Sequence, residues 1–315
     1  MKILIYGAGV IGCELAHELC KGKNDVTILA RGNWKRSIDQ KGLVIRHYGQ
    51  LHTTKDSVKT IEELKMDDKY DLIFVTMQYN QMLDVLPQIA KNVSRYIVLV
   101  GNNMTPSYCQ QQIRNQSDVQ KEVAFGFQGT GGYRKSGKVI SMHSLHVEMT
   151  IGGLMDHLTS NFQNSILTAF ESTGYKLTWE QNMEGWLLSH AAHILPTAYL
   201  CYSLDCHLRR ASKEQIRLAV DGVAEAHRML KKLEYPIRPE GEEETYQEKR
   251  KKQKSLYWMV KTPAGKYVIS THCAHAVAEM TALDQKFEEL KQKAGVSMPA
   301  WDKLRAGAAT IMGNG

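Results

Sequence analysis

Residues 1–31 read MKILIYGAGVIGCELAHELCKGKNDVTILAR, and this stretch decides the fold. Lys2 to Tyr6 is a short apolar run of the kind that is buried in a parallel sheet, and Asp25 to Ala30 is a second one. Between them, apolar side chains recur at the spacing of an amphipathic helix, at Val10, Ile11, Leu15 and Leu19. The order of strand, turn, helix and strand predicts a βαβ unit at the start of an α/β domain.

The turn of this unit, Gly7-Ala8-Gly9-Val10-Ile11-Gly12, has the GxGxxG spacing of a dinucleotide-binding site. In such a site Gly7 permits the tight turn, Gly9 lets the backbone approach a pyrophosphate, and Gly12 lets the helix pack closely on the strand. Val10 and Ile11 then open the helix whose positive N-terminus holds the diphosphate. The alternative is a glycine-rich turn in some other α/β fold.

The end of the second strand distinguishes the two nicotinamide cofactors. An NAD site places Asp or Glu there, about twenty residues after the glycines, to accept hydrogen bonds from the ribose hydroxyls. This chain has Arg31 instead, followed by Lys35 and Arg36. A guanidinium pairs bidentately with a 2′-phosphate, which a carboxylate would repel, so the sequence favours NADP(H). Lys35 and Arg36 fit a solvated loop equally well.

Composition places the protein among soluble globular proteins. The 315 residues are 43% apolar and 23% charged, which allows two domains with a sizeable core. The net charge of +7 is spread along the chain, except for Lys249-Arg250-Lys251-Lys252. No aromatic platform or nucleic-acid module accompanies that run, so we interpret it as a solvated helix face and expect no nucleic-acid partner.

Cysteine spacing and hydropathy indicate a cytoplasmic protein. The six cysteines show no CxxC spacing, which predicts reduced thiols. The first strand starts at the N-terminus without a cleavable leader, and no window approaches about 18 uninterrupted apolar residues. We therefore expect no membrane partner.

The rest of the chain divides into a strand-rich part and a helical part. The pattern predicts further strands at 71–77, 96–100, 138–142, 147–151 and 176–179, short strands or a hairpin within 43–55, and helices at 60–65, 82–90 and 161–172. After Glu180 it predicts helices at 184–200, 213–233, 240–259, 272–293 and 299–311. The expected fold is α/β: an NADP-binding Rossmann-type domain of six to seven strands at 1–178, followed by an all-helical substrate and dimerisation domain at 179–315.

Polar side chains follow two of the predicted strands. Gln78 comes after the strand at 71–77, and Asn102 comes after the strand at 96–100. Ligands of open α/β sheets bind outside the carboxyl ends of the strands. We therefore predict that Gln78 and Asn102 contribute to the cofactor site.

Several blocks of the sequence resemble the ketopantoate reductase (2-dehydropantoate 2-reductase) family over nearly the whole chain. Beside the glycine turn, Gly101-Asn102-Asn103 is similar to the family's Gln-Asn-Gly, and Trp186 to Ile194 is similar to its Lys-Leu-Leu-x-Asn-Ala-Ala-x-Asn helix. Ala278-Glu279-Met280-Thr281 and Gly295-Val296-Ser297-Met298-Pro299 resemble its Thr-Glu-x-Asp and Gly-Val-x-x-Pro blocks. The resemblance implies an NADPH-dependent carbonyl reductase that forms a homodimer through its helical domain.

Departures from the family pattern bear on catalysis. The resemblance puts Asn102 beside the nicotinamide and makes Glu279 the carboxylate that binds the substrate. The family's catalytic lysine, however, falls on Trp186, its helix asparagines fall on His190 and Ile194, and its lysine near the cofactor falls on Gln78. Trp186 cannot donate the proton that the lysine would supply.

Histidines are the candidates to replace that proton donor. The ordinary histidine pKa of about 6.5 suits an acid near neutrality, and His190 lies one helical turn after Trp186. His272, His275 and Glu279 recur at intervals of three and four residues, so they are expected to share one face of a late helix. We predict that His190, His275 and Glu279 bind substrate in one cleft, with His190, Glu279 and Asn102 as catalytic residues. His193 and His272 fit core or surface positions better.

Two HxxH pairs, His190/His193 and His272/His275, have a spacing that can share a metal ion. No further Asp, Glu or Cys stands at a suitable spacing from them, and nicotinamide chemistry needs no metal. We therefore expect no metal site.

The leading hypothesis is an NADPH-dependent reductase of a small 2-oxo acid or related carbonyl compound. The alternative is a non-catalytic NADP(H)-binding sensor or regulatory protein on the same fold, which the residues Trp186 and Gln78 favour.

Overall fold

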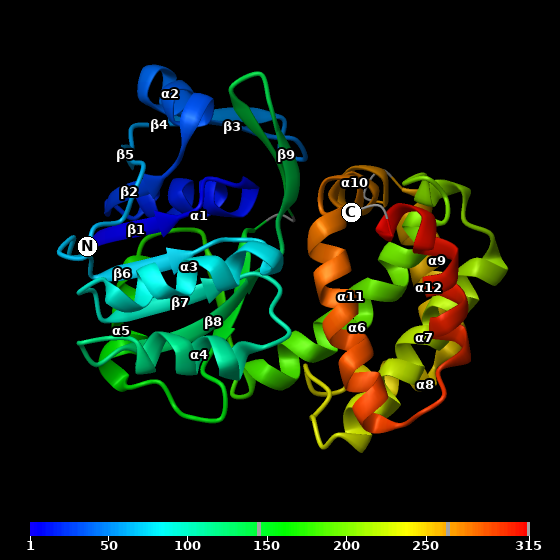
Figure 1. Cartoon of the computed structure of the whole chain (residues 1–315). Coiled ribbons are helices and arrows are strands. Elements are labelled where there is room, and N and C mark those ends of the chain that lie inside the picture. The colour runs from blue at the N-terminus through cyan, green and yellow to red at the C-terminus, as the bar shows by residue number, and fades with distance from the viewer. Residues whose placement is uncertain (144–145, 263–264, 314–315) are drawn as a thin grey trace. The chain divides into compact units, whose positions relative to one another are not determined.

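The computed structural model describes residues 1–143, 146–262 and 265–313. The chain forms two compact units. The N-terminal unit comprises Met1–Gly101 and Thr105–Met183, and the helical unit comprises Asn102–Met104 and Glu184–Gly315. Figure 1 labels most of their helices and strands.

A sheet of eight strands, counted over the described residues, forms the centre of the N-terminal unit. The strand order is β12-β11-β8-β7-β6-β1-β2-β5, and neighbours run parallel except for β8 and β11. The central strands β1 and β6 are almost wholly buried, as expected for a sheet covered on both faces. The bounds are β1 (Lys2–Tyr6), β2 (Asp25–Leu29), β5 (Lys59–Ile61), β6 (Leu72–Val75), β7 (Tyr96–Val100), β8 (Glu122–Gln128), β11 (Glu148–Gly152) and β12 (Lys176–Trp179).

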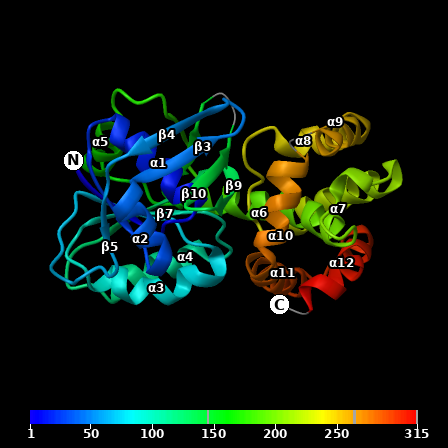
Figure 2. The same ribbon diagram turned by 90° about the horizontal axis from the view of Figure 1, so that it is seen from above.

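Helices cover both faces of this sheet. Figure 2 shows α1 (Val10–Lys21) and α5 (Ser160–Ala169) on one face and α3 (Tyr79–Lys91) and α4 (Pro106–Asn115) on the other. The chain first builds β1, β2 and β5 outward and then returns to β6 on the other side of β1. The strand order therefore reverses at β1, which is where open α/β sheets bind their ligands.

A second sheet lies over α1 (Figure 1). It has the order β4 (His52–Asp56), β3 (Leu43–His47), β10 (Lys138–Met142) and β9 (Gly131–Lys135). Helix α1 thus packs between two sheets, and each of its residues from Gly12 to Leu19 is buried. The remaining helix of this unit, α2 (Gly32–Lys41), packs beside β5.

The helical unit is held together by aromatic packing and by buried carboxylates. Trp301 is fully buried, stacks on Phe287 with ring centroids 4.4 Å apart, and meets Tyr199 edge-on at 5.3 Å. Glu225 accepts hydrogen bonds from the backbone N–H groups of Ala300 and Trp301, at 3.2 and 3.0 Å, and so caps the last helix. The helices are α6 (Met183–Tyr202), α7 (Lys213–Lys232), α8 (Glu242–Gln247), α9 (Lys249–Lys261), α10 (Thr271–His275), α11 (Val277–Ala294) and α12 (Pro299–Met312), with the short turns η1 (Leu208–Arg210) and η2 (Gly265–Ser270).

The predicted fold class is confirmed: a parallel-sheet Rossmann-type domain is followed by a helical region. The main sheet has more strands than the six to seven predicted, and the separate four-stranded sheet was not foreseen. Among the described residues no helix is both long and apolar enough to cross a membrane.

Three predicted helices were wrong in detail. The helix at 60–65 is absent, because Lys59–Ile61 instead pairs as β5 with the open edge of β2. The helix at 240–259 is divided into α8 and α9, which meet at Glu248. The helix at 272–293 is broken at Ala276, whose φ and ψ are −123° and 24°. Helices α2 and α4 were not predicted, and α2 contains Lys35 and Arg36, for which a loop was one expectation.

His227 is a buried polar residue whose environment links stability to pH. It lies on α7 with 2% of its surface exposed, edge-on to Tyr246 at 5.1 Å. Neither ring nitrogen has a hydrogen-bond partner among the described residues. Burial lowers the pKa of His227 to about 4, so the folded protein keeps this imidazole neutral.

We predict that His227 weakens the fold in acid. In the unfolded chain this histidine has a pKa of about 6.5, so the unfolded state binds a proton as pH drops from 6.5 toward 4. His227 therefore lowers the free energy of unfolding by roughly 2 kcal/mol between pH 7 and pH 5. Urea denaturation at both pH values measures the loss. His227→Leu should reduce the difference by about that amount, and the exposed His157→Asn should leave it unchanged. An equal loss in wild type and His227→Leu would contradict the prediction.

Candidate functional site

The glycine turn joins β1 to α1 at very close range. Gly7 has a φ of +122°, and a Cβ there would lie 2.7 Å from the backbone oxygen of Thr76. A Cβ at Gly12 would lie 2.0 Å from the backbone oxygen of Gly7 and 2.5 Å from Thr76 Oγ1. Thr76 Oγ1 also donates to the Gly7 oxygen at 2.9 Å. The turn therefore requires glycine at both positions, and Thr76, which the sequence did not single out, fastens it.

Gly9 leaves room where a ligand could approach. A Cβ at Gly9 would meet no atom within 4 Å, in contrast to Gly7 and Gly12. Gly9 is also the N-cap of α1 and has no side chain to satisfy the first N–H groups of that helix, which include those of Val10 and Ile11. An open backbone surface whose N–H donors have no partner within the helix fits a dinucleotide pyrophosphate.

Arg31 lies just after the second strand of the βαβ unit. It follows β2, is exposed, and is the N-cap residue of α2. Its Nε donates to the backbone oxygen of Glu62 at 3.4 Å, and it forms no ion pair within the described ranges. Lys35 instead pairs with Asp39 at 2.7 Å, and Arg36 donates to Asn33 Oδ1. Arg31 therefore differs from Lys35 and Arg36, each of which bonds to another side chain of α2.

Asn102 and Glu279 are brought together from distant parts of the sequence. Asn102 follows β7, and its Nδ2 donates to Glu279 Oε1 at 3.2 Å. The two residues expose 8% and 4% of their surfaces, and Asn102 Oδ1 has no hydrogen-bond partner among the described residues. The pair therefore presents a buried acceptor beside a buried carboxylate. Gln78 is half-buried and is the N-cap of α3, in the short connection that follows β6.

The environment of His190 gives it a pKa that differs from that of an ordinary histidine. Its ring stacks on that of Trp186 in α6, with centroids 5.1 Å apart and an interplanar angle of 9°. Burial, with smaller contributions from His193 and His272, lowers the pKa of His190 to about 3. The expectation of an ordinary histidine pKa was therefore wrong, because burial disfavours the charged imidazolium. His193 is bonded to the hydroxyl of Tyr246 at 2.5 Å.

The other predicted histidines do not form the expected face. His275 is exposed on α10, where its Nδ1 donates to the backbone oxygen of Thr271 at 2.8 Å. Because the helix is interrupted at Ala276, His272 and His275 do not continue the face that carries Glu279. Neither HxxH pair belongs to the group of converging metal-ligand side chains found among the described residues.

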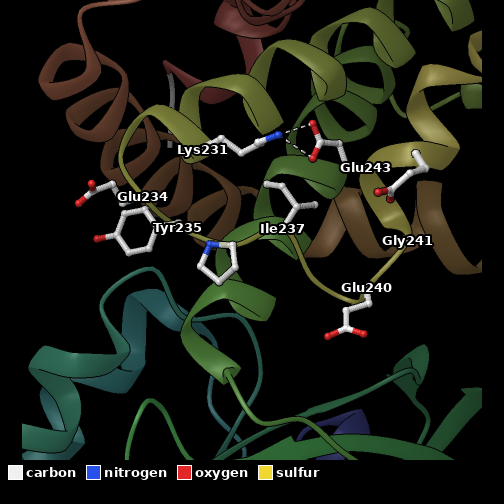
Figure 3. Close-up of a pocket in the computed structure, with 9 residues that line it drawn as sticks. Lys231, Glu234, Tyr235, Ile237, Glu240, Gly241 and Glu243 are labelled. Atoms are coloured by element: carbon white, nitrogen blue, oxygen red, sulfur yellow. Dashed lines mark hydrogen bonds and ion pairs between the residues drawn. The ribbon is translucent and has the colours of Figure 1, made fainter.

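The helical unit also has an open pocket of about 390 Å³ that none of the predicted residues lines. Figure 3 shows that Lys231 at its wall is engaged by Glu243, 2.9 Å away. The lining is rich in carboxylates and consists of Lys231, Glu234, Tyr235, Pro236, Ile237, Glu240, Gly241, Glu243 and Glu244. Its chemistry does not suit a substrate carboxylate, which these side chains would repel.

Solved structures of similar fold cover essentially the whole chain. One is 2-dehydropantoate 2-reductase of Geobacter metallireducens, with a TM-score of 0.77 and 15% identity over 98% of this chain and 99% of that one. Another is D-mandelate dehydrogenase with NADH and anilino(oxo)acetate, with a TM-score of 0.76 and 15% identity over 100% and 99% of the two chains. At this identity they establish the shared fold.

Sequence comparison finds a similarity that lies mainly in the N-terminal part of the chain. The 2-dehydropantoate 2-reductase of Pyrococcus horikoshii is 27% identical over 191 residues, which are 59% of this chain and 58% of that protein. The chain thus aligns with little more than half the length of this relative. Residues 3–155 match the family described as ketopantoate reductase PanE/ApbA. The resemblance to the ketopantoate reductase family is therefore confirmed over residues 3–155.

Proposed function

We propose that the protein is an NADPH-dependent reductase of a small 2-oxo acid or a related carbonyl compound. The observation that carries the proposal is the buried Asn102–Glu279 hydrogen bond, which leaves Asn102 Oδ1 as an unused acceptor. Buried polar atoms are normally satisfied, so an unused acceptor beside a carboxylate supports a polar ligand at this place. The match of residues 3–155 to the ketopantoate reductase family supports the reaction type.

The cofactor would be held by the glycine turn and by Arg31. The backbone at Gly7, Gly9, Val10, Ile11 and Gly12 would bind the diphosphate. Arg31, which forms no ion pair in the described part of the chain, would pair with the 2′-phosphate. Gln78 and Asn102 would contact the nicotinamide half. NADPH, when bound, supplies the hydride that reduces the carbonyl carbon.

Glu279 and Asn102 would bind the substrate. A carboxylate accepts a hydrogen bond from a substrate hydroxyl, and Asn102 would orient the carbonyl group relative to it. The similarly folded D-mandelate dehydrogenase holds anilino(oxo)acetate, an oxo acid, which supports this substrate class. We do not extend the substrate site to His275, because it is exposed and bonded to the backbone of its own helix.

His190 would act as a neutral hydrogen-bond donor. With a pKa of about 3 it carries no imidazolium proton near pH 7. A neutral imidazole can still polarise a carbonyl through its N–H group, and water then delivers the proton. The stacking on Trp186 would hold the ring in one plane for that purpose.

The alternative function is a non-catalytic NADP(H)-binding sensor. The neutral state of His190 favours it, because neither this residue nor Trp186 offers a strongly acidic proton. Turnover separates the two functions, since a sensor binds NADPH without consuming it.

Turnover is tested by NADPH oxidation across a panel of 2-oxo acids. We expect at least one to be reduced, and His190→Ala to lower kcat by about 100-fold while NADPH affinity is unchanged. The kcat of the wild type should show no decline through pH 6.5, since His190 does not titrate there. The control is His193→Ala on the same helix, whose ring is bonded to Tyr246 and should not affect kcat. No turnover over a broad panel, with NADPH tightly bound, would favour the sensor.

Cofactor choice is tested by Arg31→Asp. The change replaces attraction to the 2′-phosphate by repulsion and offers the ribose hydroxyls an acceptor, so NADPH should weaken by about tenfold or more relative to NADH. Fluorescence titration with both cofactors measures the ratio. Lys35→Ala should leave the ratio unaltered, because Lys35 is engaged by Asp39. Gly9→Val should weaken both cofactors alike by filling the space at the diphosphate. An unchanged ratio in Arg31→Asp would show that Arg31 does not bind the phosphate.

A further inference from the structure

Glu14 of α1 is a buried carboxylate in an unusual situation. Its side chain is 0% exposed, because α1 packs between the two sheets, and neither of its oxygens has a hydrogen-bond partner among the described residues. Glu18, one turn later on the same helix, is instead bonded to Lys21 at 2.9 Å. Glu14 has no Lys or Arg within ion-pair distance in the described part of the chain.

An unpaired buried carboxylate is costly. Removing such an ion from water costs several kcal/mol unless a counter-charge and hydrogen bonds compensate for the loss. Burial accordingly raises the pKa of Glu14. A bound cation would supply the missing counter-charge.

Two imidazoles face the same carboxylate oxygen. His47, at the end of β3, places Nδ1 3.5 Å from Glu14 Oε1, and His143, after β10, places Nε2 3.7 Å from it. These two nitrogens lie 3.3 Å apart. The side chains of His47 and His143 expose only 2% and 7% of their surfaces. Three potential metal-ligand atoms thus form a nearly equilateral triangle inside the N-terminal unit.

The opposite side of each ring has a partner that would orient it. His47 Nε2 lies 2.9 Å from Thr54 Oγ1, which can accept a hydrogen bond from Nε2–H and so leave Nδ1 as the lone-pair atom. The side-chain amide of Gln50 lies 3.5 Å from His143 Nδ1, so Nε2 faces the triangle. Metal-binding histidines in proteins are usually held in this way.

The distances favour a tetrahedral metal ion over the alternatives. Bonds of 2.0–2.1 Å at tetrahedral angles separate ligand atoms by roughly 3.3–3.5 Å. An octahedral site with similar bonds would separate them by about 3.0 Å. A shared proton would require a nitrogen–oxygen distance of about 2.7–3.2 Å, shorter than either histidine–Glu14 distance. The observed 3.3, 3.5 and 3.7 Å agree best with the tetrahedral case.

We propose that Glu14, His47 and His143 bind a divalent ion of the zinc class, with water as the fourth ligand. The ion joins α1 to β3 and to the segment after β10, and so fastens the second sheet to the helix that carries the glycine turn. This site is separate from the proposed reductase function. It differs from the sequence-based expectation of no metal site, which considered only the HxxH pairs.

The test is zinc binding to the metal-free full-length chain, measured by competition with a chromophoric chelator. We expect one zinc per chain, an increase in Tm on zinc addition, and strong visible absorption of the cobalt-substituted protein, as tetrahedral sites give. His143→Ala and Glu14→Gln should each weaken zinc binding by about 100-fold or more and abolish the increase in Tm. Glu14→Gln should not lower the Tm of the metal-free protein, because it removes a buried charge, so a folding defect would be distinguished from a lost ligand.

Two control variants test whether zinc binds to other residues instead. His157→Ala removes an exposed histidine of the same unit. Cys206→Ser removes a thiol from the cluster that Cys201, Cys206 and Cys273 form. In this cluster a hydrogen bond to Cys273 lowers the pKa of Cys201. Both should keep wild-type zinc affinity. Absence of zinc binding in the wild type, full affinity in His143→Ala, or loss of affinity in Cys206→Ser would each overturn the proposal.

Discussion

The contact between Gly12 and the end of β1 is the constraint on which the N-terminal unit depends. A Cβ at Gly12 would lie 2.0 Å from the Gly7 oxygen, so α1 can begin this close to the sheet only because that atom is missing. The approach directs the first N–H groups of α1 to the point where the strand order reverses beside β1. The second sheet then covers the side of α1 that faces away from the main sheet.

Burial of α1 on two sides explains why polar residues of this helix acquire partners far away in sequence. His17 is bonded to Asp56 at 2.8 Å, and Glu14 faces His47 and His143. On a one-sided surface helix such residues would be solvated. Between two sheets each needs a counter-charge or hydrogen bond, because the low-dielectric interior penalises a lone charge. The same logic applies to Asn102 and Glu279 in the helical unit.

The local sequence pattern correctly predicted elements that consist of a continuous buried apolar run or that have a clear capping residue at one end. The strand Lys2–Tyr6 matched its prediction, and α11 ends at Gly295 in the left-handed conformation that a glycine cap permits. The glycine spacing likewise predicted the close packing of the turn, where a Cβ at Gly7 or Gly12 would clash. The fold class followed from these elements, since strands alternating with helices and then helices alone leave few architectures.

Tertiary structure decided what depends on neighbours that are remote in the chain. Lys59–Ile61 became a strand because the edge of β2 was open to pairing, although its own pattern predicts a helix. The neutral state of His190 comes from burial, which residue identity does not reveal. Glu14, His47 and His143 have no common spacing, and only the folding of α1 against β3 and β10 brings them together. The sequence by itself therefore determined the fold class and the glycine turn, whereas protonation states and the convergence of side chains required the tertiary structure, because both depend on long-range packing and local dielectric.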